Sequence, residues 1–280
     1  MKALVIARLT FREALRKRMI WGVLLLSLVF AGVYYWGYTV VRADFSEEVT
    51  PEGQIITFDF VSMILVGLGF YTINFLAGVM TIFAAVGTVA GEIESGTFQA
   101  IVTKPLARWE LILGKFLGFA GMIAVYIVLM AVAVLATARR VGDYTPANWP
   151  AATGLVILVS LILLALTMLG STLLQTMANG VVVFMLYGGA LLGGLLEQLG
   201  SILNIDALVT VGIVTSLILP SDVVWRLASS LLQPSSSIRL DSPIPIAAAQ
   251  APSQAMVNYA VAYVFVALGL AMLSFRRRDL

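Results

Sequence analysis

The sequence predicts an all-α integral membrane protein with six transmembrane helices. Of its 280 residues 60% are apolar and only 11% are charged, whereas a soluble domain is about 45–50% apolar and 25% charged. Six apolar runs reach the length of about 20 residues that a membrane-spanning helix needs: 19–41, 60–90, 116–138, 151–173, 181–203 and 256–275. No polar stretch is long enough for a second domain, so we expect residues 1–280 to form a single transmembrane domain.

The residue types that are missing exclude several classes of chemistry. The sequence has no cysteine and no histidine, which removes disulfides, imidazole bases and the usual ligands of zinc and haem. We therefore expect no metal site, no bound cofactor and no catalytic centre on this chain. The net charge of +2 says little about partners, because in membrane proteins the distribution of charge matters more than the sum. We expect the lipid bilayer as a partner and no nucleic acid.

Residues 2–18 predict an interfacial helix ahead of the first span. On a helical wheel Leu4 and Phe11 lie on an apolar face, and Arg8 and Arg12 lie on a cationic face. Such a helix lies with its apolar side in the acyl boundary and its cations at the headgroups. The alternative is that the cations only fix the orientation of the first span.

The distribution of lysine and arginine predicts that both termini are cytoplasmic. With six spans and the N-terminus inside, 12 of the 17 lysines and arginines fall on the cytoplasmic side, as the positive-inside rule requires. A seventh crossing at 204–219 would place Arg276–Arg278 outside. Since Pro220 interrupts this apolar stretch, we interpret 204–233 as a re-entrant pair of helices at the outer face.

The second span is too long for a straight crossing. Its 31 residues would extend over roughly 46 Å, against a hydrocarbon core of about 30 Å. The helix must therefore tilt, break or protrude into the cytoplasm.

Residues 91–110 form a polar segment between the second and third spans. Thr97 is a plausible N-cap for a short helix, and Lys104–Pro105 ends it, because the residue before proline is disfavoured in the α region. A second helix is expected to begin near Ala107 and to continue into the third span. The product is a short cytoplasmic helix joined to two spans.

This region of the sequence resembles a known family. The matching positions are Glu92, Glu94, Gly96–Thr97, Lys104–Pro105, Arg108, Glu110 and Gly114–Lys115. They resemble the signature of ABC type-2 transporter permeases, and the NosY-like subfamily of bacterial permeases is the most similar in style. Leu219–Asp222 with Trp225–Arg226, and the ending Phe275–Leu280, fit the same family.

The resemblance implies the membrane-spanning permease subunit of an ATP-driven ABC transporter, which we expect to be an exporter, in a bacterial or archaeal plasma membrane. Two permease subunits would pair, as a homodimer, and each would dock on a separate cytoplasmic ABC ATPase through a coupling helix. By position, the docking residues would be Glu92, Glu94, Gly96, Thr97, Lys104, Pro105 and Arg108.

The chain has no Gly-x-x-x-x-Gly-Lys-Ser/Thr run, the loop that binds nucleotide phosphates in such ATPases. We therefore expect ATP and magnesium on the partner and no enzyme activity here. The alternative function is a non-transporting membrane scaffold or sensor that recruits a cytoplasmic ATPase or another partner.

Two polar residues lie inside predicted spans, where such groups are costly and often functional. Asn74 falls near the middle of the second span, either in a transport pathway or in a hydrogen bond between helices. Glu197 falls toward the outer end of the fifth span, where it lines a pathway, pairs with Arg226 or reaches water. Nearby Gly188, Gly189, Gly193 and Gly194 permit close helix approach, within the chain or at a dimer interface.

Overall fold

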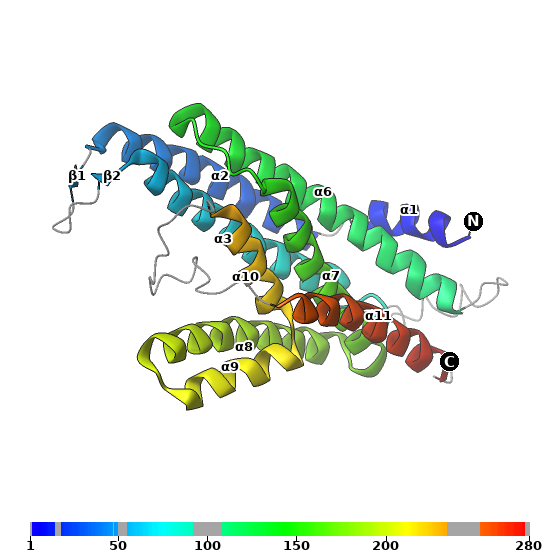
Figure 1. Ribbon diagram of the computed structural model, residues 1–280. Coiled ribbons are helices and arrows are strands. Elements are labelled where there is room, and N and C mark those ends of the chain that lie inside the picture. Colours follow the sequence, from blue (N-terminus) through cyan, green and yellow to red (C-terminus); the bar gives the residue numbers. More distant parts are fainter. Residues whose placement is uncertain are drawn as a thin grey trace.

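In the computed structural model, the residues described are 2–14, 18–46, 48–49, 55–91, 108–233 and 253–277. This part of the chain is helical apart from one antiparallel pair of two-residue strands (Figure 1). In chain order the elements are α1 (Lys2–Ala14), α2 (Arg18–Asp44), β1 (Glu48–Val49), β2 (Ile55–Ile56), α3 (Phe58–Ala85), α6 (Arg108–Gly142), α7 (Trp149–Leu173), α8 (Thr176–Leu203), α9 (Asp206–Ile218), α10 (Ser221–Leu232) and α11 (Gln254–Arg277). The strand pair was not predicted.

Six of the described helices are long and apolar enough to cross a membrane, which confirms the predicted fold class. They are α2, α3, α6, α7, α8 and α11. In Figure 1 both ends of the chain lie at one end of the helical array, and the β1–β2 pair lies at the opposite end. An even number of crossings requires the two termini to share a side. Their placement in the cytoplasm stays a prediction.

Two spans begin five or more residues earlier than their apolar runs. Helix α6 starts at Arg108, close to the predicted start near residue 107, and continues without a break through the third span. Helix α8 starts at Thr176, whereas the apolar run suggested residue 181. The difference arises because Asn179, a polar residue in the first turns of α8, is fully buried against neighbouring helices.

The long second span breaks, which was one of the three predicted outcomes. Helix α3 ends at Ala85, residues 86–89 form a turn, and Ala90 and Gly91 are helical again. The regular helix therefore ends before the polar segment between α3 and α6.

Residues 204–233 form two short helices separated at Pro220, as predicted. Asn204 adopts the left-handed conformation, with φ 55°, and it ends α8 in the way that asparagine and glycine commonly do. Helix α9 then runs back beside α8, and α10 is bent by 103° from α9. In Figure 1, α10 turns away from α8 and α9 towards α3. The bend excludes a straight seventh span here and agrees with a re-entrant pair.

Helix α7 is the centre of the packing. In its most apolar stretch of 18 residues 61% of the residues are buried, against 17% in the corresponding stretch of α2. It packs on α3, α6, α8, α10 and α11. Ile162, Leu163 and Leu164 of α7 have no exposed surface. The outer helices α2, α8 and α11 keep broad apolar faces that suit lipid or another subunit.

Helix α1 lies on the N-terminal part of α6, and the predicted helix is therefore present. A Cβ atom at Gly118 would lie 2.6 Å from the backbone oxygen of Ala7, so the two backbones touch only because position 118 is glycine. The placement of α1 at the membrane surface stays a prediction.

Candidate functional site

The predicted docking segment joins α3 to α6. Glu92, Glu94, Gly96, Thr97, Lys104 and Pro105 lie outside the described residues, and Arg108 is described only as the first residue of α6. The structure does place the two ends of the segment, at Gly91 and Arg108. The segment begins directly after the Val86–Gly91 turn. The contacts that hold this turn therefore decide whether a movement of the segment would reach the membrane helices.

Lys115 connects this turn to α6. Its Nζ donates a hydrogen bond to the backbone oxygen of Thr88 at 2.7 Å, and the side chain is only 6% exposed. A hydrogen bond from a charged donor is among the stronger ones in proteins. Leaving a charged donor unpaired in a buried site also costs more free energy than leaving a neutral one unpaired. The turn is therefore held firmly against the start of the third span.

Ser171 connects the same turn to α7. The backbone N–H groups of Val89 and Ala90 both donate to its Oγ, at 3.0 and 3.1 Å. These amides follow the end of α3, where the chain no longer supplies helical partners for every N–H. Ser171 is buried, so this contact is shielded from bulk solvent.

Asn179 connects the turn to α8. Its Nδ2 donates to the backbone oxygens of Val86 and Thr167, each at 3.0 Å. Gly170 of α7 leaves the space that the Asn179 amide occupies, since a Cβ atom there would collide with Oδ1. Lys115, Ser171 and Asn179, which we call the polar clamp, thus tie the Val86–Gly91 turn to three separate helices.

Lys115 was predicted only as part of the family pattern, and Ser171 and Asn179 were not predicted. The available signal was that both are polar residues near the 173–176 turn, where the fourth span ends and the fifth begins. That position alone does not tell a buried contact from a solvated helix end.

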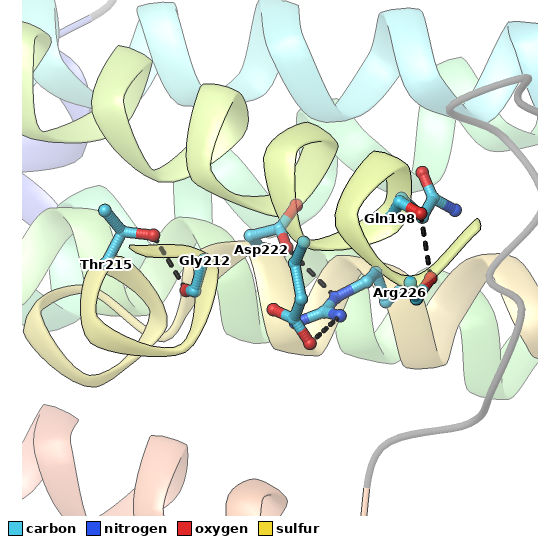
Figure 2. A network of polar contacts seen from close by, with 7 residues as sticks. Gln198, Gly212, Thr215, Asp222 and Arg226 are labelled. Atoms are coloured by element: carbon cyan, nitrogen blue, oxygen red, sulfur yellow. Dashed lines mark hydrogen bonds and ion pairs between the residues drawn. The ribbon is translucent and has the colours of Figure 1, made fainter. Parts of the chain in front are cut away.

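A second polar cluster lies between α8 and α10 (Figure 2). The Arg226 guanidinium donates to both carboxylate oxygens of Glu197, at 2.7 and 2.9 Å, and its Nε lies 3.0 Å from Oδ2 of Asp222. Glu197 therefore pairs with Arg226, one of the alternatives that the sequence left open. The same arginine also contacts Asp222, which lies one helical turn before it on α10.

Glycine makes room for this cluster. A Cβ atom at Gly194 would overlap the Asp222 carboxylate, and one at Gly193 would overlap the Thr215 side chain of α9. Both glycines thus serve packing within the chain. The neighbouring Gly188 and Gly189 face open space, with no atom within 4 Å of a Cβ placed on either.

Helix α10 is also attached to α3. The rings of Trp225 and Tyr71 meet edge to face, with their centroids 5.7 Å apart, and Trp225 is buried. The contacts among Glu197, Arg226 and Asp222, which we call the α8–α10 cluster, hold α10 against α8. Together with the ring pair they hold α10 between two spans. A change in the spacing of α3 and α8 would therefore act on α10 directly.

Asn74 lies in the core of α3. Its backbone oxygen accepts a hydrogen bond from the Tyr187 hydroxyl of α8 at 3.2 Å, while its own Oδ1 is buried without a hydrogen-bond partner. Helices α3 and α8 are thus joined at this point through the backbone of Asn74. The structure does not bring Asn74 together with Glu197 in one contact.

Among the residues that the structure describes, no group of three or more histidine, cysteine, aspartate or glutamate side chains is placed to hold a metal ion. The polar clamp and the α8–α10 cluster are made of hydrogen bonds and ion pairs between helices. Both arrangements link helices that are distant in the sequence.

The family comparison covers almost the whole chain. Residues 4–280 match the model of the ABC-2 family transporter proteins. No curated protein matches the sequence. The match does not distinguish subfamilies, so the NosY-like resemblance stays a prediction.

Proposed function

Because the chain belongs to the ABC-2 family of transporter proteins, and is thus a multi-pass membrane permease subunit, we propose that it forms the membrane half of an ATP-driven exporter and that a separate ATPase moves it through residues 92–107. Subunits of this family generally work with an ATPase partner. ATP and magnesium bind to that partner. The observation that carries the proposal is the polar clamp at the base of the segment.

The clamp supplies a route for the movement. A push on residues 92–107 acts first on the Val86–Gly91 turn, to which the segment is joined. Lys115, Ser171 and Asn179 bind that turn from α6, α7 and α8. Leaving one such buried group without its partner costs about 1–3 kcal/mol, so the turn and these helix ends favour moving together.

The α8–α10 cluster extends the route. Helix α8 carries Asn179 in its first turns and Glu197 near its other end. A shift of α8 therefore reaches α10 through the Glu197–Arg226 pair, and α10 in turn packs on α3, α7 and α11. In this way ATP-driven closure of two ATPases would change the packing at the far side of a paired permease.

The test is made with the permease purified together with its ATPase and reconstituted in liposomes. We expect a separate ABC ATPase subunit to co-purify and its turnover to rise when the permease is present. Ser171→Ala and Asn179→Ala should leave the complex intact and lower this stimulation about fivefold or more, since one buried hydrogen bond contributes about 1 kcal/mol. ATPase turnover per bound complex is the readout.

Ser201→Ala is the matched control, because Ser201 is exposed and bonds only to the Gln198 oxygen of its own helix. It should keep full stimulation. Equal stimulation in wild type, Ser171→Ala and Asn179→Ala would contradict the clamp as the transmitting element. An ATPase that binds but is not stimulated by the wild-type chain would favour the scaffold or sensor instead.

A further inference from the structure

A groove of about 570 Å³ lies between α1 and α6, beside their contact at Gly118. That volume is within the range of about 300–1,000 Å³ that small-molecule sites occupy. Its lining is mainly apolar, and the cationic members of the lining are Arg8 and Arg12. The apolar part is formed by Leu4, Ala7 and Phe11 of α1 and by Leu117, Gly118 and Gly121 of α6.

The two glycines of α6 have different roles in this groove. Gly118 allows the contact with the α1 backbone, so α1 is held close to α6 at that point. Gly121 lies almost one turn further along, and a Cβ placed on it would meet no atom within 4 Å. The floor of the groove is therefore open at Gly121, where any longer side chain would fill it.

The two arginines lie four residues apart on one face of α1, at the rim of the groove. Both are exposed, and no hydrogen bond or ion pair links either guanidinium to the described part of the chain. Guanidinium groups bind phosphate oxygens well, because their donors match the phosphate geometry. An apolar floor with two cations at its rim complements a molecule that has an acyl chain and an anionic head.

The position of the groove along α6 suits the boundary between hydrocarbon and headgroups. With 35 residues, α6 is about 52 Å long, roughly 20 Å more than the hydrocarbon core. Residues 117–121 lie about 14–20 Å from its first residue. This is the end of α6 that adjoins the predicted cytoplasmic segment, and basic pockets between membrane helices on that side bind anionic lipid headgroups.

We propose that the α1–α6 groove is a binding site for an anionic phospholipid, with its phosphate on Arg8 and Arg12 and an acyl chain along Gly121. The bound lipid fixes α1 against the third span. This site is independent of the ATPase and of the polar clamp.

The test uses the full-length chain in a neutral detergent. Native mass spectrometry measures the binding of added phosphatidylglycerol and, separately, of phosphatidylcholine. The wild-type chain binds phosphatidylglycerol more tightly. Arg8→Gln/Arg12→Gln weakens phosphatidylglycerol binding by about fivefold for each arginine and leaves phosphatidylcholine unchanged. Arg139→Gln/Arg140→Gln, which removes two exposed cations at the other end of α6, keeps wild-type binding.

A second variant tests the groove without changing any charge. Gly121→Leu fills the floor and lowers the binding of phosphatidylglycerol, whereas Gly269→Leu on α11, which also faces open space, leaves it unchanged. Leucine is favoured over glycine in a helix, so both variants retain their helices. Equal affinity of the wild-type chain for both lipids overturns the proposal. So does equal loss in the two arginine pairs, or unchanged binding in Gly121→Leu.

Discussion

Arg226 is the residue on which most of the α8–α10 contact depends. It pairs with Glu197 from one helix and with Asp222 from its own, and all three side chains are largely buried. A guanidinium between two carboxylates compensates part of their desolvation and separates two like charges. Glu197 and Asp222 each depend on it, while the arginine keeps a partner when either one is removed.

This asymmetry predicts an order of stability among substitutions. Arg226→Met leaves two neighbouring carboxylates without their cation and should lower the free energy of unfolding by about 3–5 kcal/mol. Glu197→Gln should cost less, because Arg226 retains Asp222. Thermal unfolding in detergent, followed by tryptophan fluorescence, measures both. Arg140→Met, at an exposed position on α6, is the control, and an Arg226→Met midpoint equal to that of Arg140→Met would refute the assignment.

Helix α8 has one side that packs against other helices of the chain and another side that faces outward. Gly193 and Gly194 admit Thr215 and Asp222, whereas Gly188 and Gly189 meet nothing. All four glycines lie within two turns of one helix, so the same substitution can be compared in two surroundings.

We expect alanine at Gly193 or Gly194 to destabilise the protein by about 1–3 kcal/mol, because each added methyl group overpacks a filled contact. Alanine at Gly188 or Gly189 should be neutral, or stabilising by up to about 1 kcal/mol, through its higher helix propensity. The unfolding midpoints of the four single variants decide this. Four equal midpoints would mean that α9 and α10 do not pack on α8 as described.

The elements that could be predicted from the sequence are those whose ends or bends are marked by residues at the same place in the chain. Pro220 and the count of lysine and arginine predicted the α9–α10 pair, and Lys104–Pro105 predicted a helix beginning near Ala107, one residue before the observed start. The break of α3 at Val86 could not be located, since the apolar run continues to Ala90 without a proline. Ser171 and Asn179 could not be predicted, because each is a single polar residue and its partner in the Val86–Gly91 turn lies more than 80 residues away in the sequence.

At the scale of the molecule, the described helices form a tightly packed group around α7 with a ring of apolar surface outside it. Trp36 of α2, Met185 of α8 and Phe265 of α11 are exposed, as expected where lipid or a second permease subunit covers a helix. Pairing as a homodimer stays a prediction. The polar clamp and the α8–α10 cluster lie inside this group.

The central claim is that a separate ATPase docks on residues 92–107, and a single photocrosslinking measurement tests it. Because the chain has no cysteine, Thr97→Cys or Ser201→Cys introduces one unique site for a benzophenone maleimide, with which the purified permease is labelled before the ATPase is added. We predict a covalent adduct with the ATPase from position 97 and none from position 201, which adjoins the α8–α9 turn at the opposite end. A bound ATPase that forms no adduct at position 97, or forms one at position 201, would contradict the account.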